Sequence, residues 1–135
     1  MKEDFVTYEQ ALALKELGFN EETYTYYNIG DTEIKGLPDR FSDVTFDSYN
    51  KWNNSLSAPS LAEAHKWIRS KGLFIKVFPE LVWKEGWELD VYNIKGDFYY
   101  HLETFKYITY EEALLDGISC CIKILNKKKQ TKNYN

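Results

Sequence analysis

"WELDVYNIKGDFYYHLETFKYITYEEALLDGISCCIKIL", residues 87–125, is the stretch that decides the fold. In residues 87–92 apolar side chains alternate with polar ones, and a similar alternation returns in residues 98–103. A period of two residues is typical of a strand that buries one face. The glycine-containing link between the two runs is typical of a hairpin turn. The first half of this stretch therefore predicts two antiparallel strands, with one apolar face and one wet face that carries tyrosine.

The second half of the same stretch predicts a helix over residues 110–125. Leu114, Ile118 and Cys121 recur at spacings of three and four residues, which places them on one apolar stripe. Gly117 lies in the middle of this helix, where glycine costs up to about 1 kcal/mol relative to alanine. We therefore expect another backbone to approach the helix closely at Gly117.

Six residues at the start of this helix, TYEEAL at 109–114, nearly repeat the stretch TYEQAL at 7–12. In both, a threonine is followed three residues later by glutamine or glutamate, which is the pattern of a capping box. The serine at position 60 is followed by glutamate at the same spacing. The rule predicts helices over residues 8–17 and 61–71, each followed by a glycine that can end it. The hexad is therefore interpreted as a helix-start signal and not as a duplicated functional motif.

Shorter patterns predict further strands. Residues 23–35, TYTYYNIGDTEIK, indicate a second hairpin, and residues 73–78 indicate a short apolar strand that ends at Pro79. Residues 37–60 fit neither period, apart from one short strand near 44–46. We expect the aromatic side chains of this segment to pack against the rest of the protein, so the segment should be a long but ordered loop.

Together these elements predict an α+β fold. We expect a single domain over residues 1–126, with an antiparallel sheet of about four to six strands and three helices packed against it. The polar, lysine-rich residues 127–135 are expected to form a basic flexible tail. At 135 residues the chain is long enough to bury a core but short for an elaborate enzyme.

Composition and charge narrow the function classes. A net charge of −4 argues against binding to nucleic acid or to a membrane through the overall field, and only the lysine run 127–129 favours nucleic acid. The sequence has no apolar run long enough to span a membrane, and its acidic start is unlike a signal peptide. A cytoplasmic protein is therefore expected. The aromatic content of 17% favours half-exposed binding surfaces and a homodimer.

The sequence contains no recognisable catalytic constellation. Glycine-rich phosphate loops, the dinucleotide fingerprint and the serine nucleophile elbow are absent. His65 and His101 lie in different expected elements, and neither has a partner at a metal-ligand spacing, which favours structural roles. The adjacent Cys120 and Cys121 favour burial in a helix over redox or metal chemistry. We therefore predict no catalytic residue, no metal site and no cofactor.

The remaining polar and aromatic residues favour a ligand site at the start of the second helix. An aromatic loop that leads into the N–H groups of a helix N-terminus can hold an anion or a nucleotide. The candidate ligand-binding residues are Gln10, Arg40, Trp52, Ser57, Pro59, Lys66, Trp67 and Arg69. The competing interpretation is structural and is the stronger of the two: Trp52 anchors the loop, Pro59 starts the helix, Gln10 caps the first helix, and the cations are solvated.

Four segments carry a resemblance: TYEQALALKELGF at 7–19, SAPSLAEAHKWIRSKGLFIKV at 57–77, a tryptophan-bearing strand, and TYEEALLDGISCCIKIL at 109–125. Over most of its length the chain resembles a family of small phage and prophage accessory proteins. The matching positions are Thr7, Tyr8, Glu9, Gln10, Ser57, Ala58, Pro59, Trp67 and Arg69. The resemblance implies a viral or prophage origin and implies no reaction. Residues 37–54 and the lysine-rich tail depart from the pattern, so a site in that loop is not implied for the family.

These observations favour a non-enzymatic phage-type accessory protein that acts on the host. In its most concrete form it is a small ligand-binding or inhibitory protein that counters host defence by sequestering a nucleotide-derived signal. The alternative is a protein-interaction or structural phage module without a small-molecule ligand, and a small enzyme with an unrecognised site is the least favoured. The expected partners are thus a nucleotide-like molecule or a host protein, with the chain itself forming a homo-oligomer in the host cytoplasm.

Overall fold

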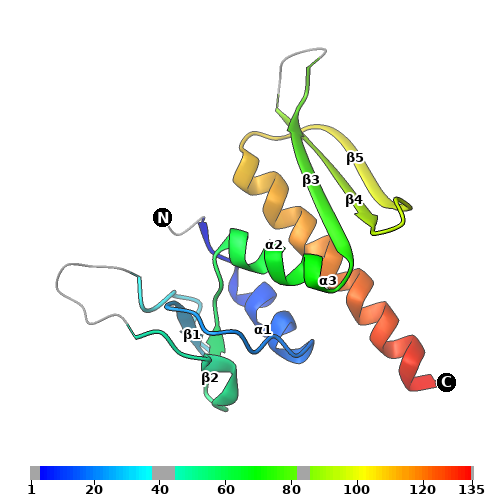
Figure 1. The fold of residues 1–135 in the computed structure, drawn as a ribbon. Helices are drawn as coiled ribbons and strands as arrows, with labels where there is room; N and C mark the ends of the chain where they lie inside the picture. The colour runs from blue at the N-terminus through cyan, green and yellow to red at the C-terminus, as the bar shows by residue number, and fades with distance from the viewer. Residues whose placement is uncertain (1–3, 38–44, 82–85, 135) are drawn as a thin grey trace. The chain divides into compact units, whose positions relative to one another are not determined.

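The computed structural model describes residues 4–37, 45–81 and 86–134, and the side chains among them except at 98–106 and 132–134. The described residues form three α-helices, one short 3-10 helix and five strands (Figure 1). In chain order the elements are α1 (Tyr8–Glu16), β1 (Tyr26–Asn28), η2 (Tyr49–Lys51), β2 (Ser55–Ser57), α2 (Leu61–Ser70), β3 (Leu73–Pro79), β4 (Trp87–Asn93), β5 (Phe98–Tyr107) and α3 (Tyr110–Tyr134). The α+β class predicted from the sequence is therefore confirmed.

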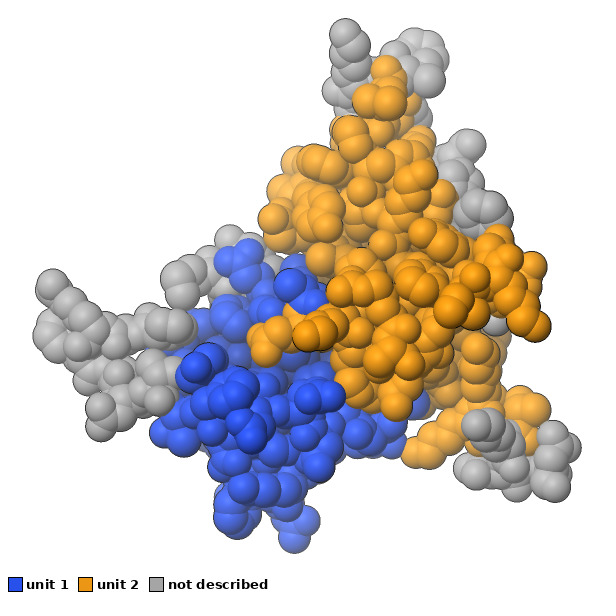
Figure 2. All heavy atoms as spheres, viewed as in Figure 1, with its two compact units in different colours: residues 1–62 blue, residues 63–135 orange. Residues whose placement is uncertain are grey.

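The chain separates into two compact units. Unit 1 comprises Met1–Ala62 and unit 2 comprises Glu63–Asn135, coloured blue and orange in Figure 2. Each unit has its own sheet, with β1 and β2 in the first and β3, β4 and β5 in the second. The single domain expected over residues 1–126 stays a prediction, and the two units are described separately below.

The strands form two small antiparallel sheets among the described residues, and not the one sheet of four to six strands that the sequence predicted. β1 pairs with β2, with Tyr26 opposite Ser57. The expected hairpin over residues 23–35 is reduced to a single bridge between Tyr26 and Lys35. β2 lies in the segment that fitted neither period in the sequence. It has only three residues, Ser55–Ser57, which is too short for an alternation to be recognised.

Unit 2 is built on the predicted hairpin. β4 is the central strand of the sheet β3–β4–β5, and its antiparallel pairing with β5 confirms the hairpin read from residues 87–103. α3 packs along one face of this sheet (Figure 1). Its buried stripe includes Leu114, Ile118 and Cys121, as the spacing predicted. The helix thus closes the core on the apolar side of the sheet.

Gly117 faces the side chains of β3 and β4 at close range. A Cβ atom placed on Gly117 would lie 2.7 Å from Cγ2 of Ile75 and 2.9 Å from Cδ1 of Leu89. The expected close approach is therefore found at Gly117. The neighbours are side chains from β3 and β4, however, and not another backbone.

α3 is longer than the sequence predicted. The helix continues to Tyr134, past the end expected at Leu125 and through most of the segment expected to be a flexible tail. Residues 126–134 contain no glycine or proline that would end a helix, and lysine and glutamine are good helix formers. Ile122 is the last buried residue among the described side chains of α3, and residues 127–131 are exposed, so no apolar stripe in residues 127–131 indicates that the helix continues.

Unit 1 begins with the predicted capping box. The Gln10 N–H donates to Thr7 Oγ1 at 3.2 Å, and the Thr7 N–H donates to Gln10 Oε1 at 3.0 Å. The helix that follows contributes Ala11 and Leu14 to a core that also contains Leu56 from β2. Local capping and an apolar face therefore place α1 against the small sheet. In the described part of the chain, no helix is both long enough and apolar enough to cross a membrane.

Candidate functional site

Residues 45–57 of unit 1 are held in place by side-chain hydrogen bonds. Asn50 Nδ2 donates to the carbonyl of Phe19 at 2.7 Å, and Asn50 Oδ1 accepts from the Ser57 N–H at 2.8 Å. The hydroxyl of Ser55 donates to the carbonyl of Tyr49 at 2.8 Å. The expectation of an ordered loop is therefore confirmed for its described part. Val44, where one short strand was expected to begin, lies outside the described residues.

Lys15 ties helix α1 to this loop. Its ammonium group donates to the carbonyl of Trp52 at 2.6 Å and to the carbonyl of Ser55 at 3.0 Å. The helical pattern predicts that Lys15 faces solvent, and nothing nearby in the sequence signals the contact. Its partners lie 37 and 40 residues further along the chain, so only the folded unit brings them together.

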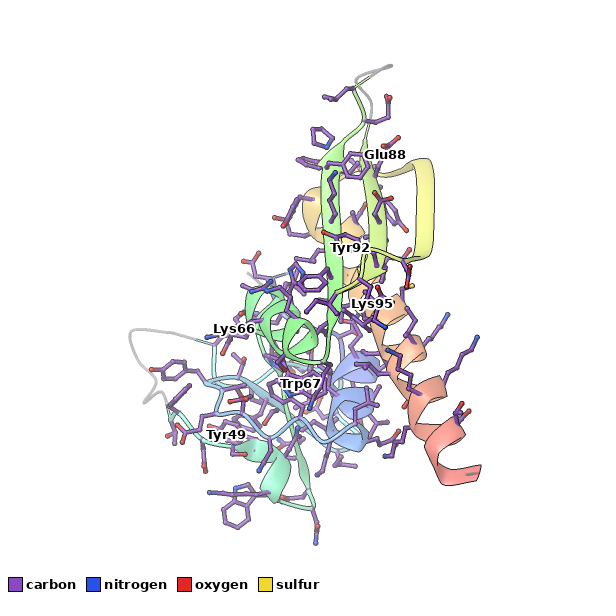
Figure 3. All side chains as sticks on the ribbon, turned by 45° about the vertical axis from the view of Figure 1, so that its right-hand side comes forward. Tyr49, Lys66, Trp67, Glu88, Tyr92 and Lys95 are labelled. Atoms are coloured by element: carbon purple, nitrogen blue, oxygen red, sulfur yellow. The ribbon has the colours of Figure 1, made fainter. Side chains whose placement is uncertain are left out.

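The outer side of β1 and the segment before it presents aromatic rings. Thr23, Thr25 and Tyr27 are buried, so Tyr24 and Tyr26 point to the opposite side. Tyr24 contacts Phe46, with ring centroids 4.6 Å apart, and Tyr26 stacks on Tyr49, with centroids 4.4 Å apart and an interplanar angle of 22°. We call these four side chains, Tyr24, Tyr26, Phe46 and Tyr49, the tyrosine face. Figure 3 labels Tyr49.

The tyrosine face is exposed although its backbone is fixed. Tyr24 is 51% exposed and Phe46 is 48% exposed. An antiparallel bridge between Thr23 and Asp47 holds the two segments side by side, with N–H to carbonyl distances of 2.8 and 3.1 Å. The hydroxyl of Tyr49 donates to the carbonyl of Thr45 at 2.7 Å. The rings are therefore pre-organised, which lowers the entropy cost of binding a partner.

Lys51 and Asp47 form an ion pair next to Tyr49 in the sequence. Lys51 Nζ contacts Asp47 Oδ1 at 2.9 Å, and this hydrogen bond is the main reason that the pKa of Asp47 lies below its ordinary value. Burial, and then the proximity of Tyr26 and Asp47, raise the pKa of Tyr49. At neutral pH Asp47 is therefore ionised and Tyr49 is a neutral hydrogen-bond donor.

Four predicted ligand residues lie in the described part of unit 1. Gln10 is 6% exposed and is engaged in the capping box, and Ser57 is fully buried, with its hydroxyl accepting from the Asn50 N–H at 3.2 Å. Pro59 is buried and its carbonyl accepts from Val6. Trp52 is 52% exposed, and the Lys51 ammonium group lies 5.1 Å from its ring centroid. Gln10, Ser57 and Pro59 thus have internal structural roles, and Trp52 is exposed although its side chain also forms a hydrogen bond with Asp47.

The other predicted ligand residues belong to unit 2, apart from Arg40, which lies outside the described residues. Lys66 and Arg69 are exposed on α2, three residues apart (Lys66 is labelled in Figure 3). Trp67 is only 8% exposed, and the Lys71 ammonium group lies 5.0 Å from its ring centroid. The assignment of all eight residues as ligand contacts stays a prediction.

The titratable side chains in unit 2 have structural surroundings. The backbone N–H of Ile75 points to His65 Nε2 at 3.4 Å, and burial, followed by the proximity of Arg69, lowers the pKa of His65. Burial is also the main cause that raises the pKa of Cys121 to about 12, so its thiol stays protonated at neutral pH. Among the described residues, no group of three or more His, Cys, Asp or Glu side chains could hold a metal ion.

Sequence reasoning detected only part of the tyrosine face. The alternation in TYTYYN already places Tyr24 and Tyr26 on one side of an extended segment. Phe46 and Tyr49 were visible only as aromatic residues of the loop. Neither a scan against protein-family models nor searches of curated proteins and of solved structures finds a match to this chain.

Proposed function

We propose that this chain is a non-enzymatic binding protein whose tyrosine face contacts a partner protein. The observation that carries the proposal is a pair of aromatic contacts, tilted between Tyr24 and Phe46 and stacked between Tyr26 and Tyr49, on a backbone fixed by the bridge between Thr23 and Asp47. Tyrosine is enriched at protein interfaces because its large ring loses little conformational entropy on binding and its hydroxyl tolerates water. A partner that covers the exposed sides of Tyr24 and Phe46 would remove apolar surface from water.

The resemblance to phage and prophage accessory proteins supports a biological setting for this binding. In that setting the chain acts in the host cytoplasm and inhibits a host defence protein by occupying its surface. A second copy of the chain is the alternative occupant of the tyrosine face, in keeping with the expected homo-oligomer. Size-exclusion chromatography over a range of concentrations distinguishes these two, because self-association increases with the concentration of the chain.

A second candidate function is the sequestering of a nucleotide-derived signal. The exposed pair Lys66 and Arg69 on α2 favours it, because two cations three residues apart share one helix surface and can contact the same phosphate group. Thermal-shift screening of nucleotides and cyclic nucleotides tests this candidate. A ligand that raises the melting temperature of the wild-type chain, but not that of a Lys66→Ser/Arg69→Ser variant, would support it.

The principal experiment compares the tyrosine face with this basic pair. Tagged wild-type chain, a Tyr24→Ser/Phe46→Ser variant and the Lys66→Ser/Arg69→Ser variant are each incubated with bacterial lysate, and a protein retained by the wild type is purified and titrated calorimetrically. We expect the Tyr24→Ser/Phe46→Ser variant to lose at least about tenfold in affinity, as when interface hot spots are removed. The basic-pair variant should bind like the wild type.

Circular dichroism and thermal unfolding of each variant show that the fold is retained. Tyr24 and Phe46 are about half exposed, so their replacement should cost little stability. A partner that is retained by the Tyr24→Ser/Phe46→Ser variant with unchanged affinity would exclude the tyrosine face as the binding surface. Its loss from the basic-pair variant would instead place binding on α2.

A further inference from the structure

Two acidic residues that precede the tyrosine face in the sequence have no charged partner among the described residues. Glu21 and Glu22 directly precede the segment that carries Tyr24, and both are exposed. Neither makes a hydrogen bond or an ion pair within the described part of the chain. The nearby lysines are already engaged: Lys51 contacts Asp47 at 2.9 Å, and Lys35 lies within 4 Å of two other carboxylates. Among the described residues that flank the tyrosine face in the sequence, negative charges therefore outnumber positive ones.

The charge of the whole unit has the same sign. Residues 1–62 contain 11 Asp and Glu against 5 Lys and Arg, a net charge of −6. Residues 63–135 contain 12 Lys and Arg against 10 Asp and Glu, a net charge of +2. The net charge of −4 is therefore the sum of an acidic unit 1, which carries the tyrosine face, and a slightly basic unit 2. Such a field repels nucleic acid and free nucleotides and attracts a cationic partner.

We propose that the tyrosine face binds an arginine-bearing basic segment of a partner protein, an inference that rests on the proposed binding function. A guanidinium group is planar and weakly hydrated, so it can stack on an aromatic ring while its N–H groups donate to a carboxylate. Tyr24 and Phe46 offer exposed ring surface, and Glu21 and Glu22 offer carboxylates a few residues away in the chain. The chain already contains a cation over a ring in the same segment, where Lys51 lies over Trp52.

Defined peptides test this inference without knowledge of the natural partner. The full-length chain, labelled with nitrogen-15, is titrated with capped ten-residue peptides of alternating Arg-Gly, Lys-Gly or Gln-Gly. We expect the arginine peptide to shift the amide signals of residues 21–26 and 46–52, the lysine peptide to bind several-fold more weakly, and the glutamine peptide to leave these signals unchanged. Raising the salt concentration from about 50 to about 300 mM should weaken the arginine complex several-fold.

Charge variants locate the electrostatic contribution. A Glu21→Gln/Glu22→Gln variant should lose at least about threefold in affinity for the arginine peptide, since two of the attracting charges are removed. The control, Glu9→Gln/Glu111→Gln, makes the same change in net charge on two helices outside this segment and should lose much less. The amide spectrum of each variant without peptide shows whether its fold is intact.

Three outcomes would overturn the inference. These are equal binding of the glutamine peptide, unchanged affinity in the Glu21→Gln/Glu22→Gln variant, and signal shifts confined to unit 2. None of them contradicts the tyrosine face as a protein-binding surface, because that proposal is judged by the loss of a purified partner in the Tyr24→Ser/Phe46→Ser variant. The two proposals can therefore fail separately.

Discussion

Gly117 shows how one absent side chain sets the distance between a helix and a sheet. Ile75 and Leu89 occupy the space beside it, and Leu89 is fully buried. A glycine in a helix interior costs up to about 1 kcal/mol relative to alanine. The chain accepts this cost because a larger residue would push α3 away from β3 and β4.

Gly117→Ala should therefore lower the free energy of unfolding, although alanine is the better helix former. Overpacking of a filled core costs about 1 to 3 kcal/mol, which exceeds the gain in helix propensity, so we expect a net loss of about 1 kcal/mol in urea denaturation. Lys123→Ala, on the exposed side of the same helix, is the matched control and should change stability by less than about 0.5 kcal/mol. An increase in stability for Gly117→Ala would show that the core has room for a methyl group.

In unit 1 a single side chain, Lys15, joins α1 to the loop that carries Trp52. Its ammonium group donates to two carbonyls of that loop. Replacing Lys15 by methionine keeps the aliphatic stem and removes the donors. Each of the two hydrogen bonds contributes about 1 kcal/mol net, so the loop should open at least about fivefold more often.

Hydrogen exchange measures this opening. The amide of Ile29, which donates to the carbonyl of Asn54, should exchange faster in the Lys15→Met variant, while the amide of Val6, bonded to Pro59, serves as an internal reference. Lys15→Arg retains a charged donor and should restore part of the protection. Equal exchange of Ile29 in all three proteins would mean that Lys15 does not hold the loop.

At the scale of elements, the helices and strands differ in how far local sequence determines them. The threonine of each repeated hexad begins a helix, because the capping hydrogen bonds span only three residues. Strand pairing is different: all three residues of β1 pair with a segment almost thirty residues later, and only the single bridge between Tyr26 and Lys35 joins β1 to its neighbour in the sequence. Nothing in the intervening turn specifies that choice.

The C-terminal end of α3 gives a prediction at this scale. Truncating the chain after Asn126 removes the final turns, in which residues 127–131 are exposed, and leaves Ile122, the last buried residue among the described side chains of α3. The truncated chain should lose helical circular-dichroism signal while its unfolding midpoint stays nearly unchanged. Ile122→Ala, in contrast, should cost about 2 to 4 kcal/mol as a buried large-to-small change. A large loss of stability on truncation would mean that the last turns make contacts that stabilise the fold.

For the whole molecule, His65 makes stability depend on pH. Its pKa is lowered in the folded chain, so the unfolded chain binds the proton more tightly. The stabilising effect of the neutral imidazole is fully present above the unfolded pKa of about 6.5 and is lost as the pH falls through the folded pKa. The urea midpoint of the wild type should therefore decrease between pH 7.5 and pH 5.

His65→Gln separates this effect from the titration of other groups. Glutamine can still accept a hydrogen bond from the Ile75 N–H but carries no charge at any of these pH values. As the pH falls, the urea midpoint of the wild type should therefore decrease more than that of the His65→Gln variant. A constant difference from pH 7.5 to pH 5 would contradict the assignment of this pH dependence to His65.

The sequence alone determined the α+β class, the starts of the helices and the central hairpin. It could do so because the signals, capping boxes and alternation along a strand, depend on residues a few positions apart. Only the tertiary structure decided that the strands form two sheets in two units, that Lys15 binds the loop carbonyls, and that Tyr24 and Tyr26 meet Phe46 and Tyr49. These contacts join segments more than twenty residues apart, and their formation depends on how the whole unit buries its apolar side chains.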